Sequence, residues 1–250
     1  METVWIAFSM FSALPVPQAE WKKESMRYTL IAFPLVGAVI GILCVLWILI
    51  SEIFTFPAIL RAAGLCAIPV LVTGGIHLDG YCDTWDARAS HGTEEKMQAI
   101  LKDPHLGTFA VIHVCLYFII AFALWAAMPQ LRLLPAALMF CLSRTLSGLS
   151  LTIFKIRPGS GLVSTFADAA EKKRVRIVLT AASVILAVLI CIGGGWLMVP
   201  AAVLVFFRYR NLAERQFGGL SGDLAGWFLQ TAELWMLGAY CLQQYVGVML

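Results

Sequence analysis

The stretch that decides the fold is LIAFPLVGAVIGILCVLWILI, residues 30–50, which contains 21 residues and no charged side chain. An α-helix rises about 1.5 Å per residue, so a helix of this length crosses a hydrocarbon core of about 30 Å. The composition of the 250-residue chain agrees, because 60% of its residues are hydrophobic and 13% are charged, against about 25% charged in soluble domains. We therefore predict an integral membrane protein.

Similar apolar runs recur along the chain and predict further membrane spans. They cover residues 56–73, 109–128, 133–154, 177–192, 196–207 and 224–248. The sequence thus predicts an all-α, polytopic membrane bundle of about seven transmembrane segments, in which residues 1–250 form a single membrane-embedded domain. A shorter apolar run, residues 4–14, cannot span a bilayer and predicts an interfacial or re-entrant segment.

The run at residues 196–207 is short and contains Pro200, so two arrangements are compatible with it. Either residues 193–195, all glycine, turn the chain into a separate tilted helix, or the fifth and sixth runs form one long helix. Merging the two runs would move the loop at residues 208–223, with its three Arg, to the opposite face. We therefore prefer the hairpin.

Charged loops indicate the orientation of the bundle. If seven spans alternate, the loops at residues 18–28, 79–106, 155–176 and 208–223 share one face. These loops hold all 18 Lys and Arg residues except Arg61, Arg132 and Arg144. By the positive-inside rule, this face is predicted to be cytoplasmic.

Other features of the sequence exclude some functions and leave others open. A net charge of +3, without a basic block interleaved with aromatics, predicts no nucleic-acid partner. The seven Cys residues form no C-x-x-C pair and are interpreted as reduced packing residues. The Gly37-x-x-x-Gly41 spacing either seats a neighbouring helix or is incidental.

The densest polar motif is GGIHLDGYCDTWD, residues 74–86. Asp79, Asp83 and Asp86 are spaced i, i+4, i+7, so on a helix they share one face and repel one another. A solvated helix start would explain acids in the first turn only, with a basic residue nearby. Here the acids continue to Asp86, and no basic residue follows His77 until Arg88, beyond the motif. A divalent cation would relieve the repulsion, and hard oxygen ligands predict Mg²⁺ or Mn²⁺.

The other residues of this motif leave more than one role open. On a helix, His77 projects away from the Asp face, and a proton acceptor, a metal ligand, a partner of a ligand and a structural residue are all compatible with it. Gly74, Gly75 and Gly80 permit either tight turns or the close approach of a phosphate to the backbone.

A second motif is LKDPHLGTF, residues 101–109. Gly107 and Thr108 open a helix whose N-terminal amides could receive an anion. Lys102 could contact phosphate, and Asp103 could complete a metal site. A simple capped loop is the alternative, and the spacing alone favours it.

A third motif, FGGLSGD at residues 217–223, precedes the last predicted span. It resembles a phosphate-binding loop before a helix but lacks the Gly-Lys-Ser/Thr of the P-loop, and a flexible turn is the alternative. All three motifs are predicted on one face, where they could converge with basic side chains, among them Lys102 and Arg157. Metals and cations around a phosphate are what phosphoryl transfer requires.

Two ionisable residues are predicted deep in the membrane. Arg144 lies inside the fourth predicted span and Glu233 inside the seventh. Such groups usually face a polar cavity, so we expect them to pair with each other or to contact substrate.

Taken in order, the three motifs resemble the cobalamin synthase family, the adenosylcobinamide-GDP ribazoletransferases or cobalamin-5′-phosphate synthases. The resemblance extends to FSALPVP at residues 11–17 and to Arg27, Pro34, Gly37 and Gly41, so it covers essentially the whole chain. The sequence departs from the family pattern at Ala87, Pro104 and Ala110. None of these departures removes a carboxylate.

The resemblance implies a polytopic, Mg²⁺-dependent transferase. Members of the family join adenosylcobinamide-GDP to the 3′-hydroxyl of α-ribazole or its 5′-phosphate, release GMP and complete the nucleotide loop of vitamin B12. The implied location is the bacterial cytoplasmic (inner) membrane, with a multi-pass chain and an active site facing the cytoplasm. Association with other corrinoid-pathway enzymes, or into a homo-oligomer, is left open.

Motif and resemblance together give a candidate site. The predicted catalytic residues are His77, Asp79, Asp83 and Asp86. The predicted metal ligands are Asp79, Asp83, Asp86, Asp103 and Asp223. The predicted substrate- and phosphate-binding residues are Gly74, Gly75, Gly80, Arg88, Lys102, Gly107, Thr108, Gly218, Gly219, Ser221 and Gly222.

Two other functions are weighed against this one. A CDP-alcohol phosphotransferase also has an Asp-rich helix, but its pattern requires Ala-Arg three residues after Asp-Gly, and here Tyr81 and Cys82 follow Gly80. A cation-coupled transporter would place its acids near the bilayer midplane, whereas these acids are predicted at the cytoplasmic ends of the spans.

Overall fold

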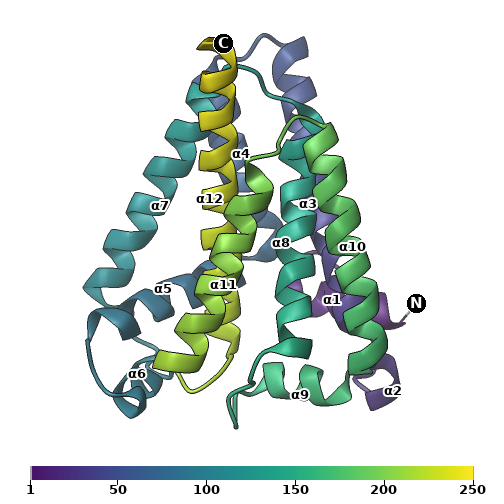
Figure 1. The fold of residues 1–250 in the computed structure, drawn as a ribbon, viewed down its shortest axis with the longest axis vertical. Helices are drawn as coiled ribbons and strands as arrows, with labels where there is room; N and C mark the ends of the chain where they lie inside the picture. Colours follow the sequence, from purple (N-terminus) through teal and green to yellow (C-terminus); the bar gives the residue numbers. More distant parts are fainter. Residues whose placement is uncertain (1, 250) are drawn as a thin grey trace.

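The computed structural model describes residues 2–249, which are built from helices joined by short loops (Figure 1). The helices are α1 (Glu2–Phe11), α2 (Lys23–Met26), α3 (Thr29–Ile53), α4 (Ala58–Thr73), α5 (Ile76–Ala89), α6 (Glu94–Ile100), α7 (Thr108–Ala127), α8 (Leu133–Ile153), α9 (Leu162–Ala169), α10 (Lys172–Ile192), α11 (Met198–Gln216) and α12 (Gly222–Met249). Within residues 2–249 the only strand-like pairing is an isolated bridge between Ile156 and Leu220. The all-α prediction is confirmed.

Each of the seven predicted runs is a helix, but the count of seven spans is not confirmed. Among the described residues, α3, α7, α8 and α10 are long and apolar enough to cross a membrane, and α4 with α5 would add a fifth, bent by 95°. The C-terminal half of α11 is charged, and α12 contains several polar residues. Because α12 is mostly covered by its neighbours, it does not need the apolar surface of a lipid-facing helix.

The hairpin interpretation of the fifth and sixth runs is confirmed. Helix α10 ends at Ile192, and Gly194 then adopts a left-handed φ of 83°, which an L side chain rarely adopts, before α11 begins. The side chain of Gln243 holds this turn, since its Nε2 donates to the Gly194 carbonyl oxygen at 2.6 Å. Its Oε1 also accepts from the Leu197 amide at 3.0 Å.

Gly37 and Gly41 seat α8 directly against α3. A Cβ at Gly41 would lie 2.6 Å from the Ala137 carbonyl oxygen, and a Cβ at Gly37 would overlap the backbone of Phe140. The two helix backbones therefore touch, as small residues four apart permit. The packing interpretation of this spacing is confirmed.

A buried ion pair joins the middle of α8 to the middle of α12. Arg144 is fully buried and donates to the carboxylate of Glu233, which is 3% exposed. Ser143 Oγ also donates to Glu233 at 2.8 Å. The two predicted intramembrane charges therefore pair with each other, and Nε and Nη2 of Arg144 have no partner among the described residues.

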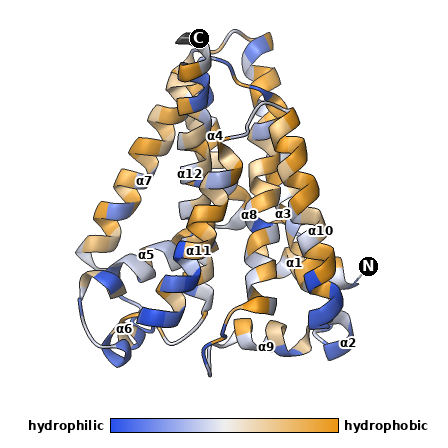
Figure 2. Cartoon of the chain, viewed as in Figure 1, coloured by the Kyte–Doolittle hydropathy of each residue, from blue (hydrophilic) through white to orange (hydrophobic). Residues whose placement is uncertain are grey.

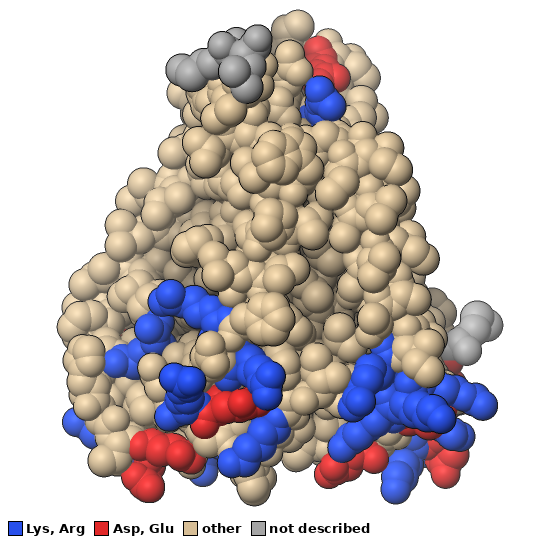
Figure 3. Space-filling view, in the orientation of Figure 1, with Lys and Arg blue, Asp and Glu red and all other residues tan. Residues whose placement is uncertain are grey.

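Charge is concentrated at one end of the bundle. The sides of the long helices are apolar (Figure 2), and nearly all charged side chains visible in Figure 3 surround the end that bears α2, α5, α6 and α9. This separation of charged and apolar surface is typical of a membrane protein.

Helix α1 is ten residues long, too short to span a membrane, and packs against α3. All seven Cys residues are free, but Cys115 and Cys191 are exposed, so the interpretation as packing residues is wrong for these two.

We predict that Gly37→Ala destabilises the protein, because the added Cβ has no space between α3 and α8. Overpacking of this kind costs about 1–3 kcal/mol. The matched control is Gly238→Ala, whose Cβ would meet only Leu124, at 3.8 Å. The apparent melting temperature in detergent should fall for the first variant only; equal melting temperatures would show that the α3–α8 contact is not tight.

We also predict that Glu233→Gln destabilises the protein by about 3–5 kcal/mol, because it leaves the buried guanidinium of Arg144 without a counter-charge. Replacing both residues by apolar ones of similar size, in the double variant Arg144→Met and Glu233→Leu, should recover most of the loss. Thermal unfolding in detergent measures both. A double variant no more stable than the single one would contradict the proposed pairing.

Candidate active site

The acidic motif begins at a sharp bend between α4 and α5. Gly74 and Gly75 have left-handed φ angles of 64° and 81°, a conformation that favours glycine. They turn α5 by 95° from the direction of α4, so α5 runs across the charged end of the bundle (Figure 1). This bend explains both glycines structurally and brings the acids to the charged end.

Helices α5 and α12 cross at two glycines. A Cβ at Gly80 would lie 2.7 Å from the Cα of Asp223, and a Cβ at Gly226 would lie 2.7 Å from the His77 carbonyl oxygen. The two backbones therefore touch, which brings Asp79 and Asp83 of the first motif beside Asp223 of the third. Gly80, a predicted phosphate-binding residue, contacts the backbone of α12 and also lines the cavity described below.

The crossing creates a concentration of negative charge. Partial burial and then the charges of Asp79, Asp223 and Asp86 raise the pKa of Asp83 to about 7. Across residues 2–249, no Lys or Arg comes within 4.0 Å of these four carboxylates. No group of three or more His, Cys, Asp or Glu among the described residues has the arrangement of a metal site, so the Mg²⁺ prediction remains a prediction.

Asp86 connects the first two motifs. Its Oδ2 accepts from the Gly107 amide at 2.6 Å, and its Oδ1 accepts from the Ala110 amide at 2.8 Å. Asp86 thus provides the carboxylate that caps α7, a favourable place for negative charge. These amides were expected to receive a substrate anion, but the protein's own carboxylate occupies them. Thr108, beside them, is exposed.

The loop before α7 stays apart from these acids. Asp103 and Lys102 are exposed, and Asp103 Oδ1 accepts from the His105 amide at 3.0 Å. The same oxygen lies 2.7 Å from His105 Nδ1. Asp103 contributes nothing to the shifted pKa of Asp83. The structure therefore does not bring these two predicted residues to the acid cluster.

The third motif is tied to the segment before α9. The Leu220 amide donates to Lys155 O at 2.8 Å, and the Arg157 amide donates to Leu220 O at 3.1 Å. This backbone pairing requires glycine at 219, where φ is 147° and a Cβ would lie 2.7 Å from the Arg157 nitrogen. Gly218 is also left-handed, with a φ of 72°. The pairing places the side chain of Arg157 close to Asp223.

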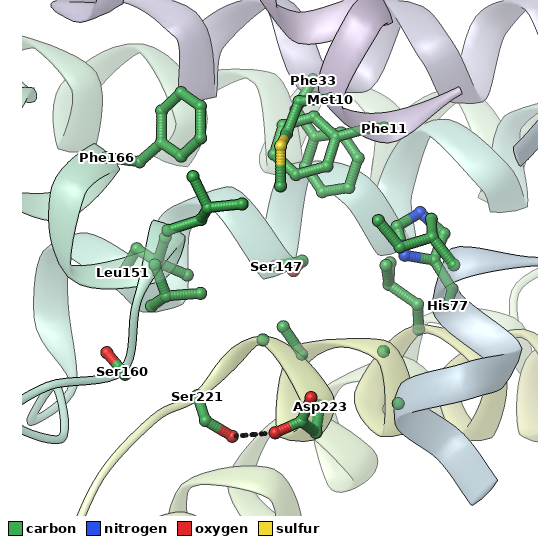
Figure 4. Close-up of a pocket in the computed structure, with 18 of the residues that line it drawn as sticks. Met10, Phe11, Phe33, His77, Ser147, Leu151, Ser160, Phe166, Ser221 and Asp223 are labelled. Carbon is green, nitrogen blue, oxygen red and sulfur yellow. Dashed lines mark hydrogen bonds between the residues drawn. The ribbon is translucent and has the colours of Figure 1, made fainter. Parts of the chain in front are cut away.

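These elements enclose a cavity of about 280 Å³ at the junction of α1, α3, α5, α8, α9 and α12. Figure 4 shows its two sides. One side is apolar and aromatic, formed by Met10, Phe11, Phe33 and Phe166. The other presents polar groups from four segments: His77 and Asp79, Ser147, Arg157 and Ser160, and Ser221, Gly222 and Asp223. The cavity can hold a flat apolar group, with an anionic group beside Arg157.

Ser221 organises the start of α12 at this cavity. Its Oγ donates to Asp223 Oδ2 at 3.3 Å and accepts from the Leu224 amide at 3.4 Å. Ser221 is 1% exposed. The hydroxyl therefore acts as a helix cap and orients the Asp223 carboxylate.

His77 lines the same cavity and is neutral. Burial, and then the charge of Arg144, lower the pKa of His77 to about 3. Its ring packs 5.9 Å from that of Phe33, and Nε2 has no partner among the described residues. A neutral imidazole with a free nitrogen can form a hydrogen bond with a ligand, but it is a weak base at neutral pH.

Arg88 lies on another side of α5. It is nine residues beyond Asp79, about half a turn around a helix of 3.6 residues per turn. Its guanidinium packs over the ring of Trp85, 4.5 Å from the centroid, and 6.0 Å from that of Trp227. Arg88 is absent from the lining of the cavity that contains Asp79.

The motifs did not reveal the apolar side of the cavity, Ser147, Ser160 or Gly226. The aromatic residues of the apolar side, Phe11, Phe33 and Phe166, come from α1, α3 and α9, and only the tertiary fold brings them together. Gly226 had a local signal, because it follows Gly222 by four residues, the spacing that permits close helix contact.

The family model described as cobalamin-5-phosphate synthase matches residues 3–241. An adenosylcobinamide-GDP ribazoletransferase of Lachnoclostridium phytofermentans is 43% identical over 242 residues, covering 94% of this chain and 91% of that protein. An adenosylcobinamide-GDP ribazoletransferase of Pseudomonas fluorescens is 34% identical over 243 residues, covering 95% of this chain and 98% of that protein. No solved structure matches the chain.

The family match extends from the first helix into the last. The family match includes all three motifs and the glycines at which α5 and α12 cross. The chain belongs to the cobalamin-5-phosphate synthase family.

Proposed function

We propose that the chain is an adenosylcobinamide-GDP ribazoletransferase, which transfers the adenosylcobinamide-phosphate group from adenosylcobinamide-GDP to the 3′-hydroxyl of α-ribazole or its 5′-phosphate. The observation that supports this most is the cavity in which an aromatic side faces Asp79, Asp223 and Arg157. It lies where the first and third motifs of the family meet. The CDP-alcohol phosphotransferase and transporter alternatives are not favoured by the family match.

The shape of the cavity suggests how the two substrates divide the site. Ligand cavities usually measure about 300–1,000 Å³, and this one, at about 280 Å³, suits a nucleoside and not a corrinoid ring. The bicyclic aromatic base of α-ribazole would pack among Phe11, Phe33 and Phe166. The corrinoid would remain outside, with its pyrophosphate reaching toward Asp79 and Asp223.

The reaction needs one bond formed and one broken at phosphorus. The 3′-hydroxyl oxygen of ribazole attacks the phosphorus bonded to the corrinoid side chain, and the bond from that phosphorus to the bridging oxygen breaks. GMP leaves with the bridging oxygen, and the hydroxyl proton passes to a base. Asp79 is our candidate for that base, because its carboxylate lines the cavity where the hydroxyl group would lie.

Arg157 and the third motif would hold the phosphates. Arg157 is 8% exposed, and its Nη1 has no partner among the described residues. A guanidinium binds phosphate oxygens through paired hydrogen bonds. Ser221 and Gly222 lie beside it in the same cavity, where the N-terminal end of α12 also favours an anion.

Mg²⁺ fits the donor set of this site. Asp79, Asp83 and Asp223 supply hard carboxylate oxygens whose mutual repulsion a divalent cation would relieve. When bound, the ion would neutralise charge on the pyrophosphate and on the departing GMP. Asp86 already accepts two backbone hydrogen bonds and Asp103 lies in the exposed loop, so we assign them a smaller part in metal binding.

The orientation follows from the charge distribution. The charged end of the bundle contains α5, α9 and the first turn of α12 (Figure 1). The positive-inside rule places this end in the cytoplasm. We therefore propose a multi-pass protein of the bacterial inner membrane whose site opens toward water-soluble substrates in the cytoplasm.

We predict that Asp83→Asn lowers Mg²⁺-dependent turnover at least about a hundredfold, because it removes a charge from the metal-binding cluster. Turnover is measured in proteoliposomes from adenosylcobinamide-GDP and α-ribazole, following GMP and the corrinoid product with and without Mg²⁺. The matched control is Asp168→Asn on α9, an exposed acid that should leave turnover unchanged. Near-normal activity of Asp83→Asn would disprove the metal assignment.

Asp86→Ala should mainly affect stability. Removing the cap from α7 costs about 0.5–2 kcal/mol, and the amides of Gly107 and Ala110 lose their acceptor. The apparent melting temperature should fall for Asp86→Ala and stay close to wild type for Asp83→Asn. The reverse order would show that Asp86 is not the capping residue.

A further inference from the structure

A second recess lies on the membrane side of the bundle, away from the candidate active site. It is an apolar groove between α7, α11 and α12, with a volume of about 660 Å³. Its lining includes Ile120 and Leu124 of α7, Leu204 of α11, and Trp235 and Leu242 of α12. Ile120, Leu204, Trp235 and Leu242 are exposed large hydrophobic residues, so the groove is open to the surrounding medium.

A basic pocket lies at the charged end of the same region. Its volume is about 240 Å³, and its lining contains three arginines: Arg88 of α5 with Arg208 and Arg215 of α11. Asn211 and Gln216 add further hydrogen-bonding groups. Figure 3 shows basic side chains gathered at this end, below the apolar face.

The three arginines have no acidic partner in the part of the chain that the structure describes. Within residues 2–249, no carboxylate lies within 4.0 Å of Arg88, Arg208 or Arg215. Nη1 of Arg88 is buried without a hydrogen-bond partner. By contrast, Arg210 on the same helix donates to Glu214 at 3.1 Å. A cluster of like charges with a buried unpaired donor indicates an anion from outside the chain.

The groove and the basic pocket both lie along one side of α11. Within α11, the lining positions recur every three or four residues, singly or as adjacent pairs: Pro200 and Ala201, Leu204, Arg208, Asn211 and Leu212, and Arg215 and Gln216. Such intervals place residues on one side of a helix. Four residues separate Leu204 from Arg208, which is about 6 Å along the axis. One ligand could therefore occupy both recesses.

We propose that this face binds an acidic phospholipid, with its phosphate among Arg88, Arg208 and Arg215 and an acyl chain in the groove. A basic pocket at the membrane surface matches an anionic headgroup in charge, and basic pockets between transmembrane helices on the cytoplasmic side recognise acidic lipids. The groove matches a hydrocarbon chain in chemistry.

This lipid site differs from the proposed transferase site. Arg88 faces away from Asp79 on α5, and the two cavities share no lining residue. The lipid would instead fix the position of α11 relative to α5 and α7. Its presence can be tested without any corrinoid substrate, so failure of one proposal leaves the other standing.

The test is native mass spectrometry of the detergent-purified full chain, titrated with phosphatidylglycerol or phosphatidylcholine of the same acyl chains. Wild type should bind one phosphatidylglycerol at least about tenfold more tightly than phosphatidylcholine. The double variant Arg208→Gln and Arg215→Gln should lose this preference. The control Arg210→Gln removes an arginine paired with Glu214 and should keep it.

A second variant tests the groove. Ala201→Trp fills the lining of α11 without changing the arginines, and it should weaken phosphatidylglycerol binding while leaving the preference for the acidic headgroup. Equal binding of both lipids by wild type would overturn the proposal. So would undiminished preference in the double arginine variant, binding of glycerol phosphate as tight as that of the lipid, or a dimer that excludes lipid.

Discussion

The site depends on the direct contact between the backbones of α5 and α12. Gly80 and Gly226 leave no space for a side chain where these helices cross, and the crossing alone brings acids from two motifs far apart in sequence to one place. Burial is the main cause of the raised pKa of Asp83, and the contact adds the charge of Asp223 to those of Asp79 and Asp86 on the same helix. The bend at Gly74 and Gly75 supports it by turning α5 across the charged end of the bundle.

Helix α12 connects the functional end to the membrane core. Its first turn bears Asp223 at the cavity, and its middle bears Glu233, which pairs with Arg144. Arg144 also lowers the pKa of His77, so the buried ion pair and the cavity are electrostatically linked. A helix with these polar groups must be covered by others, which explains why α12 is central and why its own hydropathy does not identify it as a span.

Much of the fold could be predicted from the sequence, because lipid allows few alternatives to helices. All seven apolar runs are helices, and the turn at Gly194 and the α3–α8 contact at Gly37 follow the predicted spacing. The number of spans could not be predicted, because it depends on which helices are covered by neighbours. Asp86 was grouped with its helical neighbours by periodicity, but only the tertiary structure shows that it caps α7. The same holds for the aromatic side of the cavity, whose members are distant in sequence.

The central claim is that the crossing of α5 and α12 assembles the transferase site, and turnover of Gly226→Ala beside wild type tests it most directly. The measurement is release of GMP and formation of corrinoid product from adenosylcobinamide-GDP and α-ribazole in proteoliposomes with Mg²⁺. We predict equal amounts of the two products from wild type. In the folded variant we predict a loss of about tenfold or more, because the added methyl group pushes Asp223 away from Asp79 and Asp83. Product formation as fast in Gly226→Ala as in wild type, or none by folded wild type, would contradict the account.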